Sequence, residues 1–176
     1  LARSTGLAAS TISALVHELI KQGDLTLERR AGARSARLVR LAAPPGVVVG
    51  LDRGRRHLAV AGADLEGQVL ADQRMRISED LGAAESMVEL GALLDRTLAE
   101  TEHQRADVHR GALALPVPVD ISSGQLGSAS ILPRWAGIDP ALLCSEELGF
   151  TVSAHNDTNV GAVGEARAGA GRVERH

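Results

Sequence analysis

Residues 46–77 read GVVVGLDRGRRHLAVAGADLEGQVLADQRMRI, and their pattern predicts the first strands of a sheet. It opens with a valine-rich apolar run that is too short for a comfortable helix, which predicts a buried strand. A second strand is predicted over HLAVAGADL, with a turn at residues 64–67, and a third over residues 68–77, where apolar side chains alternate. Three strands joined by tight turns predict an antiparallel meander.

The residues after the meander alternate between helix and strand patterns. A helix is predicted over residues 83–102, where four apolar side chains share one face, and a buried strand over GALALPVPV at residues 111–119. After a long loop come a short helix over residues 140–148 with Asp139 as its N-cap, a strand over residues 151–155 and a last helix. The order βββαβαβα predicts an α/β fold with a mixed sheet.

Two prolines mark a boundary before this α/β region. Pro44 and Pro45 lie in LAAPPGVVVG at residues 41–50, where they stop any regular element and stiffen the chain. We therefore predict two domains, residues 1–43 and residues 44–176.

The first domain has the pattern of a helix-turn-helix followed by a wing. Residues 10–22 form an amphipathic helix with Ser10 as its N-cap, Gly23 after its end and a turn at Gly6 before it. Residues 24–29 and 36–41 read as two strands around the basic segment RRAGARS. The apolar stripe of the predicted helix over residues 10–22 consists of Ile12, Leu15, Val16, Leu19 and Ile20.

The polar face of this helix starts with small side chains, as in a helix that enters the major groove. The candidates for base contacts are Ser10, Thr11, Ser13, Ala14 and His17. The candidates for phosphate or minor-groove contacts are Arg29, Arg30, Arg34 and Arg37. Each pattern has an ordinary alternative, because most amphipathic helices pack a core and most basic hairpins are only solvated.

The net charge differs between the two domains. Residues 1–43 hold seven basic and three acidic residues, a net charge of +4, so the total of −3 leaves −7 for the rest. A basic first domain followed by an acidic second domain suggests that the two domains bind different partners. Trp135 and Phe150 are the only aromatic residues, which leaves no stacking platform for single strands and favours duplex DNA.

Other compositional features narrow the class of protein. Cys144 is the only cysteine, which excludes a disulfide or a thiolate cluster within these residues, and its leucine-rich surroundings predict a small buried side chain on a helix. No apolar run is long enough to span a membrane, and the start lacks a secretory pattern. We expect a cytoplasmic protein with no membrane partner.

Four spaced segments resemble the ROK family of repressors, open reading frames and sugar kinases. They are GLAASTISALVHELIKQGDL at residues 6–25, GLDRGRRHLAVAGADLEGQVL at 50–70, PVPVDISSGQLGSASILPRWAGID at 116–139, and HNDTNVGAVGEARAGAG at 155–171. The resemblance implies the first lobe of an actin-like ATPase fold, which is ribonuclease-H-like, preceded by a winged helix-turn-helix.

The resemblance also implies a sugar site. Asp157 stands where the family's kinases have the general base that takes a proton from a sugar hydroxyl, and Asn156 stands where a neighbouring Asn binds the sugar. Glu165 and the loop over residues 135–139 are expected to support them. Taken alone, the residues leave open that Asn156 and Asp157 only cap the last helix.

The chain departs from the family's kinases at the phosphate loop. Asp52 is followed by RGRR, which lacks the family's Thr and has arginine for its second glycine, so we do not expect this loop to hold ATP. Val117 replaces a glycine between two prolines, and ARS at residues 33–35 stands where the family's regulators commonly have Gly-Arg-Pro. These changes favour a regulator over an enzyme.

The sequence thus predicts a transcriptional repressor of carbohydrate metabolism that responds to a sugar or a sugar derivative. We expect it to bind an operator of double-stranded DNA as a homodimer or a higher homo-oligomer. The resemblance implies an amino-terminal fragment that begins inside the second helix of the winged domain and stops after the first lobe. We expect no cofactor within it, and a zinc motif of clustered cysteines only in the second lobe. The alternatives are an ATP-dependent ROK sugar kinase with an added domain, or a module whose basic first domain binds protein.

Overall fold

The computed structural model describes residues 5–29, 37–42, 46–120, 123–127 and 130–171. The chain forms two compact units, Leu1–Pro45 and Gly46–His176. The sequence-based boundary lies after residue 43, and the structural division falls after Pro45.

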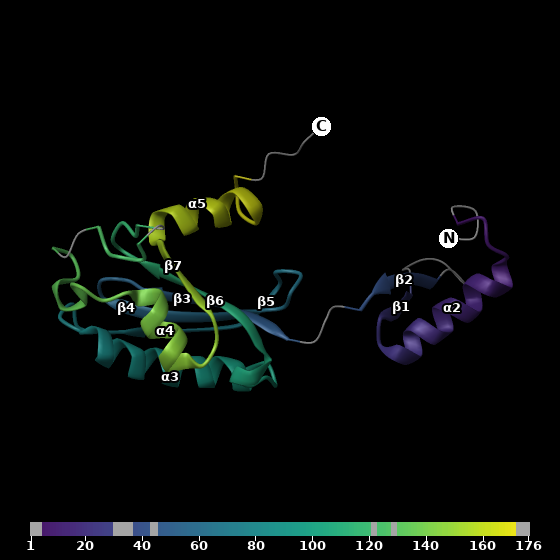
Figure 1. Ribbon diagram of the computed structural model, residues 1–176, viewed down its shortest axis with the longest axis horizontal. Coiled ribbons are helices and arrows are strands. Elements are labelled where there is room, and N and C mark those ends of the chain that lie inside the picture. The colour runs from purple at the N-terminus through teal and green to yellow at the C-terminus, as the bar shows by residue number, and fades with distance from the viewer. Residues whose placement is uncertain (1–4, 30–36, 43–45, 121–122, 128–129, 172–176) are drawn as a thin grey trace. The chain divides into compact units, whose positions relative to one another are not determined.

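The first unit contains a helix and a hairpin. Helix α2 (Ala9–Gln22) precedes the antiparallel strands β1 (Leu25–Arg29) and β2 (Arg37–Leu41), and contacts β1 (Figure 1). The helix ends at Gly23, whose φ of 84° allows its amide to donate to Ile20 O. The prediction of Ser10 as N-cap is wrong, because Ala8 holds that position and its carbonyl accepts from the amide of Ile12 at 3.0 Å. Alanine is a strong helix former, so the helix extends back to Ala9.

The apolar stripe of α2 is only partly covered. Ile12, Val16 and Ile20 are half-buried, whereas Leu15 is 49 % exposed and Leu19 36 % exposed. The hairpin covers only one side of the helix. The side of the apolar stripe with Ile12, Val16 and Ile20 is therefore partly buried, whereas the side with Leu15 and Leu19 is exposed to solvent.

The second unit is built on a mixed five-stranded sheet. Its strands are β3 (Val47–Arg53), β4 (His57–Ala63), β5 (Val69–Arg76), β6 (Val108–Leu115) and β7 (Val152–Asn156), in the order β5-β4-β3-β6-β7. The first three form the expected antiparallel meander, while β3 with β6 and β6 with β7 pair in parallel. The predicted order and the mixed sheet are confirmed.

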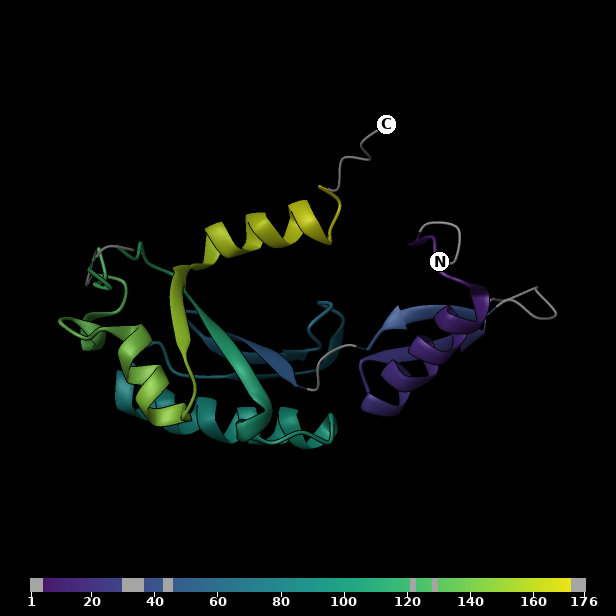
Figure 2. The same ribbon diagram turned by 45° about the vertical axis from the view of Figure 1, so that its right-hand side comes forward.

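Helices cover the two faces of this sheet unequally. Helix α3 (Ala83–Glu100) and helix α4 (Pro140–Leu148) lie on one face, and helix α5 (Asp157–Arg167) lies on the other, as Figures 1 and 2 show. Two 3₁₀ turns complete the unit, Arg105–Asp107 before β6 and Pro133–Trp135 before α4. Asp139 caps α4 as predicted, accepting from the amides of Ala141 and Leu142 at 2.9 and 3.0 Å.

The core lies between the sheet and α3. Side chains alternate along β3, so that Val47, Val49 and Leu51 are buried on the side of the core while Val48, Gly50 and Asp52 face the other side. Helix α3 contributes Leu90, Leu94 and Leu98, all nearly inaccessible to solvent. Burial of such side chains stabilises the fold by about 1.5–3 kcal/mol each.

The opposite face of the sheet is lined by small side chains. Gly50, Ala61 and Ala112 are neighbours across β3, β4 and β6. Helix α5 above them has no buried residue, in contrast to α3. Space therefore remains between this face and α5, and the candidate site lies there.

Candidate ligand cleft

The site begins at the junction of β7 and α5. Asn156 is the last residue of β7 and the N-cap of α5, and its Oδ1 accepts from the amide of Asn159 at 3.2 Å. Its Nδ2 donates to Val117 O at 3.2 Å, which ties the junction to the loop after β6. Asp157 Oδ1 accepts from the amide of Thr158 at 2.6 Å. The capping role left open by the sequence is thus real for Asn156, whose side chain is half-buried.

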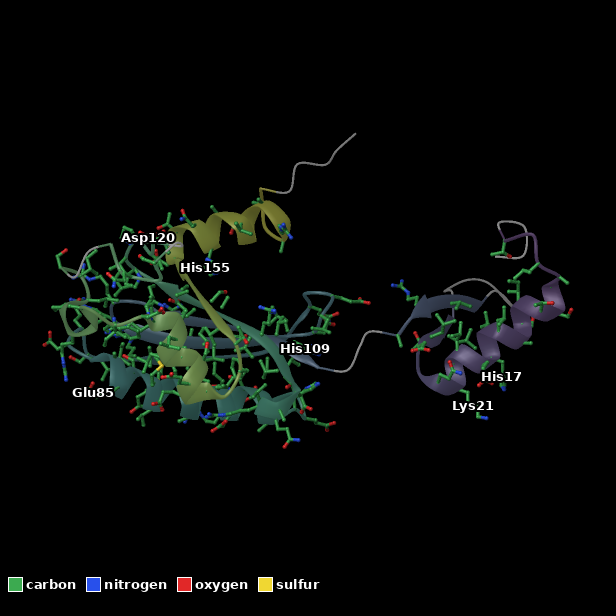
Figure 3. The ribbon with its side chains drawn as sticks, viewed as in Figure 1. His17, Lys21, Glu85, His109, Asp120 and His155 are labelled. Atoms are coloured by element: carbon green, nitrogen blue, oxygen red, sulfur yellow. The ribbon has the colours of Figure 1, made fainter. Side chains whose placement is uncertain are left out.

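Cavities separate α5 from the sheet. One of about 300 Å³ is lined by His155, Asn156 and side chains of α5, among them Val160 and Val163. Another of about 450 Å³ is lined by Asp52 of β3 and Asp157 of α5 over a floor of small residues. His155 and Asp120 both lie at the end of the unit where α5 begins (Figure 3). Three carboxylates, those of Asp52 in β3, Asp72 in β5 and Asp157 in α5, therefore line this one cavity.

Side chains next to the turn between β3 and β4 occupy the space over its backbone. His57 Nε2 lies 2.7 Å from Asp52 Oδ2, and the His57 ring occupies the space that a Cβ on Gly54 would need, with its nearest atom 2.0 Å from that position. Arg55 and Arg56 are exposed, and both approach Glu79.

Arg53 points the other way, into the core. Its side chain is fully buried, Nη1 donates to Gly54 O and Nη2 to Leu81 O, each at 2.7 Å. Its guanidinium carbon lies 6.0 Å from the centre of the Trp135 ring. Burial lowers the pKa of Arg53 from its ordinary value. Sequence reasoning missed this role, although the alternation of β3 places Arg53 on the same face as the buried Val47, Val49 and Leu51.

The residues expected to support the sugar site lie elsewhere. Trp135 is fully buried beside Arg53, and Asp139 caps α4, so neither is among the residues that line the two cavities. Glu165 is two turns along α5 from Asp157, and its Oε2 accepts from the amide of Ala170 at 3.0 Å. Val117, which replaces the family's glycine, is fully buried, and its carbonyl accepts from Asn156.

The candidates for DNA contact are placed in part. Ser10, Thr11, Ser13, Ala14 and His17 are all exposed on α2. His17 and Lys21 project from the same side of this helix (Figure 3). Arg29 ends β1 opposite Arg37, which starts β2, whereas Arg30 and Arg34 lie outside the described residues.

Several absences apply to the described residues. They contain no group of three or more His, Cys, Asp or Glu arranged to hold a metal ion. No helix among them is long and apolar enough to cross a membrane.

Cys144 is buried with its Sγ 3.3 Å from the sulfur of Met87, and burial raises the pKa of its thiol to about 12. The predicted structural role of this cysteine is confirmed.

Comparison with known proteins places the fold. No protein-family model and no curated protein matches the sequence. Among solved structures, a ROK family transcriptional regulator, homolog of the E. coli Mlc protein, is similar with a TM-score of 0.58 and 19 % identity over 94 % of this chain and 42 % of its own.

Two kinases are similar over a shorter part of the chain. The ROK hexokinase from Thermus thermophilus has a TM-score of 0.60 and 23 % identity over 71 % of this chain and 40 % of its own. The ROK family glucokinase from Streptomyces griseus, in complex with glucose and AMPPNP, has a TM-score of 0.60 and 24 % identity over 72 % of this chain and 38 % of its own. The chain thus has the fold of ROK proteins and spans less than half the length of these three.

Proposed function

We propose that the chain is the amino-terminal part of a sugar-responsive transcriptional regulator that binds operator DNA. The extent of the structural likeness carries this proposal. Leu1–Pro45 makes up about a quarter of the chain, so an alignment over 94 % with the ROK regulator must include most of the first unit. The alignments with the two kinases, over 71 % and 72 %, are shorter than that.

The β3–β4 turn supports a regulator that does not transfer phosphate. A loop that binds nucleotide phosphates needs backbone amides within reach of the phosphate oxygens, which favours glycines. Here the His57 ring packs over Gly54 and hydrogen-bonds Asp52, while Arg55 and Arg56 extend from the turn toward Glu79. We propose that this turn no longer binds ATP.

The cleft supports binding of a polar ligand such as a sugar. Asp157 and Asn156 offer hydrogen-bonding groups at the start of α5, beside a cavity with a small apolar floor. Since α5 has no buried residue, little packing opposes its displacement. In this proposal a sugar bridges α5 and the sheet, and the favoured position of α5 changes the geometry of a homodimer and weakens its binding to DNA.

The first unit supplies the DNA contacts in this proposal. Helix α2 would read base edges with its exposed small side chains, and the arginines around the hairpin would contact phosphates or the minor groove. We propose in addition that the first unit is a winged helix-turn-helix, that the protein is a homodimer and that it acts as a repressor. A zinc motif in a second lobe is also part of this proposal.

The test separates the regulator from its rival, a ROK sugar kinase with an added domain, which the likeness to kinases favours. Full-length protein is assayed for binding to operator duplex with and without a panel of hexoses and amino sugars, and for ADP formation with the same panel. We expect a sugar to release the DNA and ADP formation to stay at background. Turnover that depends on sugar would establish the kinase instead.

A further inference from the structure

Arg53 is an unusual residue for the position it occupies. Its side chain is fully buried, yet no carboxylate of the described residues forms an ion pair with it. Burial of an unpaired charge is unfavourable, so the charge must be held by neutral acceptors or an aromatic ring. The two carbonyls and the Trp135 ring described above are such partners.

These partners come from three separate segments. Gly54 belongs to the β3–β4 turn, Leu81 to the segment between β5 and α3, and Trp135 to the 3₁₀ turn before α4. Arg134 strengthens the same connection, because it donates to Asp80 O at 3.0 Å and to Glu85 Oε1 at 2.7 Å. The β3–β4 turn and the turn at Trp135 are therefore both attached to residues 80–85.

The contact between Arg53 and Trp135 is polar and incompletely paired. Arg53 Nε and Trp135 Nε1 are buried donors that meet no acceptor in the part of the chain that the structure describes, and both residues line a cavity of about 10 Å³. That volume is about the size of a single water molecule, which can accept from two donors. We call this contact between Arg53 and Trp135 the joint. Its strength is more sensitive to the distance between the two side chains than that of a close-packed apolar contact.

The joint is connected to the cleft through β3. Asp52 and Arg53 are adjacent in one strand and project from opposite faces of the sheet. Asp52 lines the cavity of about 450 Å³ together with Asp157, whereas the guanidinium of Arg53 lies 6.0 Å from the centre of the Trp135 ring on the other face. A shift of the backbone at Asp52 would be transmitted to Arg53, because the two residues are joined by one peptide bond in a hydrogen-bonded strand.

We propose that Arg53 is a positioning residue of this cleft, which links Asp52 to the turn that carries Trp135. A sugar that contacts Asp52 then alters the environment of Trp135 on the other side of the sheet. The inference rests on the proposed function, in which a sugar binds between α5 and the sheet.

The experiment follows the Trp135 ring directly. Full-length protein is labelled with 5-fluorotryptophan, and the ¹⁹F resonance of Trp135 is assigned by its loss in Trp135→Phe. Calorimetry measures binding of glucose, mannose and N-acetylglucosamine to each variant. We expect the sugar that binds to shift the Trp135 resonance in the wild type. In Arg53→Met we expect about tenfold weaker sugar binding, or 1.4 kcal/mol, and loss of most of that shift at saturating sugar.

Matched variants separate positioning from stability. Arg55→Met removes the same charge two residues along the turn, where the side chain is 65 % exposed, and should leave both readouts unchanged. Arg53→Lys keeps the charge but offers a single donor nitrogen in place of the guanidinium fork, and it should restore part of the shift. It carries the test if Arg53→Met does not fold. The inference is overturned if the Trp135 resonance of the wild type does not shift when sugar binds, or if it shifts by the same amount in Arg53→Met. Absence of sugar binding to the wild type overturns the proposed function as well.

Discussion

At the residue scale, one side chain can serve the fold and the site together. Asn156 caps α5 through its Oδ1 and holds the loop after β6 through its Nδ2. Asp157, one residue on, hydrogen-bonds Thr158 and Asn156 alone among the described residues, and it lines the cavity of about 450 Å³. The fold thus depends more on Asn156, and Asp157 is freer to bind a ligand.

This difference predicts the behaviour of Asp157→Asn. The variant should fold and bind operator DNA as before, but sugar-induced release should weaken by about 1.5–3 kcal/mol, because a charged acceptor of hydroxyl groups is lost. DNA binding titrated with sugar measures both quantities. Glu165→Gln, two turns along the same helix, is the matched control and should have a smaller effect. If Asp157→Asn fails to fold, Asp157 is a structural cap and the site assignment is wrong.

At the element scale, the start of α3 illustrates how an ion pair supports a helix end. Helix α3 has no side-chain hydrogen bond at its N-cap, Gly82. The pKa of Glu85 is held below its ordinary value, first by its own backbone amide and then by Arg134. The charged carboxylate also suits the positive end of the helix dipole.

The pH dependence of stability follows from the direction of this pKa shift. Because the folded state lowers the pKa of Glu85, its contribution is present above the unfolded pKa of about 4.3 and is lost as the pH falls through the folded value. Glu85→Gln should therefore lower the melting temperature of the second unit near pH 7, and by less near pH 3. Trp135 fluorescence reports this unfolding. Glu146→Gln, an exposed change on α4, is the control, and an equal loss at both pH values would contradict the assignment.

The helix and the wing of the first unit make separable contributions to DNA binding in our proposal. Arg34→Ala should weaken binding to all duplexes alike and reduce the salt slope by about one unit. Ser13→Ala or His17→Ala should instead lower the preference for operator over scrambled duplex by about 1–3 kcal/mol. Isotherms at two salt concentrations distinguish the two effects, with Arg34→Lys as the variant that keeps the charge. If Arg34→Ala changes specificity and the helix variants do not, the wing is the reader.

At the scale of the whole molecule, the proposal requires two sites that influence each other. A sugar that lowers DNA affinity by some factor must bind more weakly, by the same factor, when the protein holds DNA. Such couplings usually amount to about 1–3 kcal/mol.

Reciprocity gives the whole-molecule prediction. Calorimetric titration of sugar into free protein and into its complex with operator duplex should give dissociation constants whose ratio equals the sugar-induced loss of DNA affinity. Scrambled duplex at the same salt concentration is the control. Equal sugar affinities with and without operator, in a protein whose DNA is released by sugar, would show that the release does not pass through the sugar site.

The local elements of this protein could be predicted from the sequence alone. The valine run at residues 47–49, the alternation along β4 and the leucines of α3 predict strands and a helix, because these patterns depend only on the geometry of neighbouring residues. Asp139 before Pro140 predicts a helix start for the same reason. The N-cap predicted at Ser10 lies two residues after the observed N-cap, Ala8, because residue patterns place a helix end only to within one or two residues.

Contacts between residues far apart in the sequence could not be predicted in this way and follow from the three-dimensional arrangement of the elements. Asp52 and Asp157 share a cavity because β3, β6 and β7 pair in parallel, which brings the ends of β3 and β7 to the same edge of the sheet. Arg53 reaches Trp135 because α3 and the turn before α4 lie on the same face of the sheet. These contacts follow from strand order and from packing between elements, and no periodicity within a single segment contains that information.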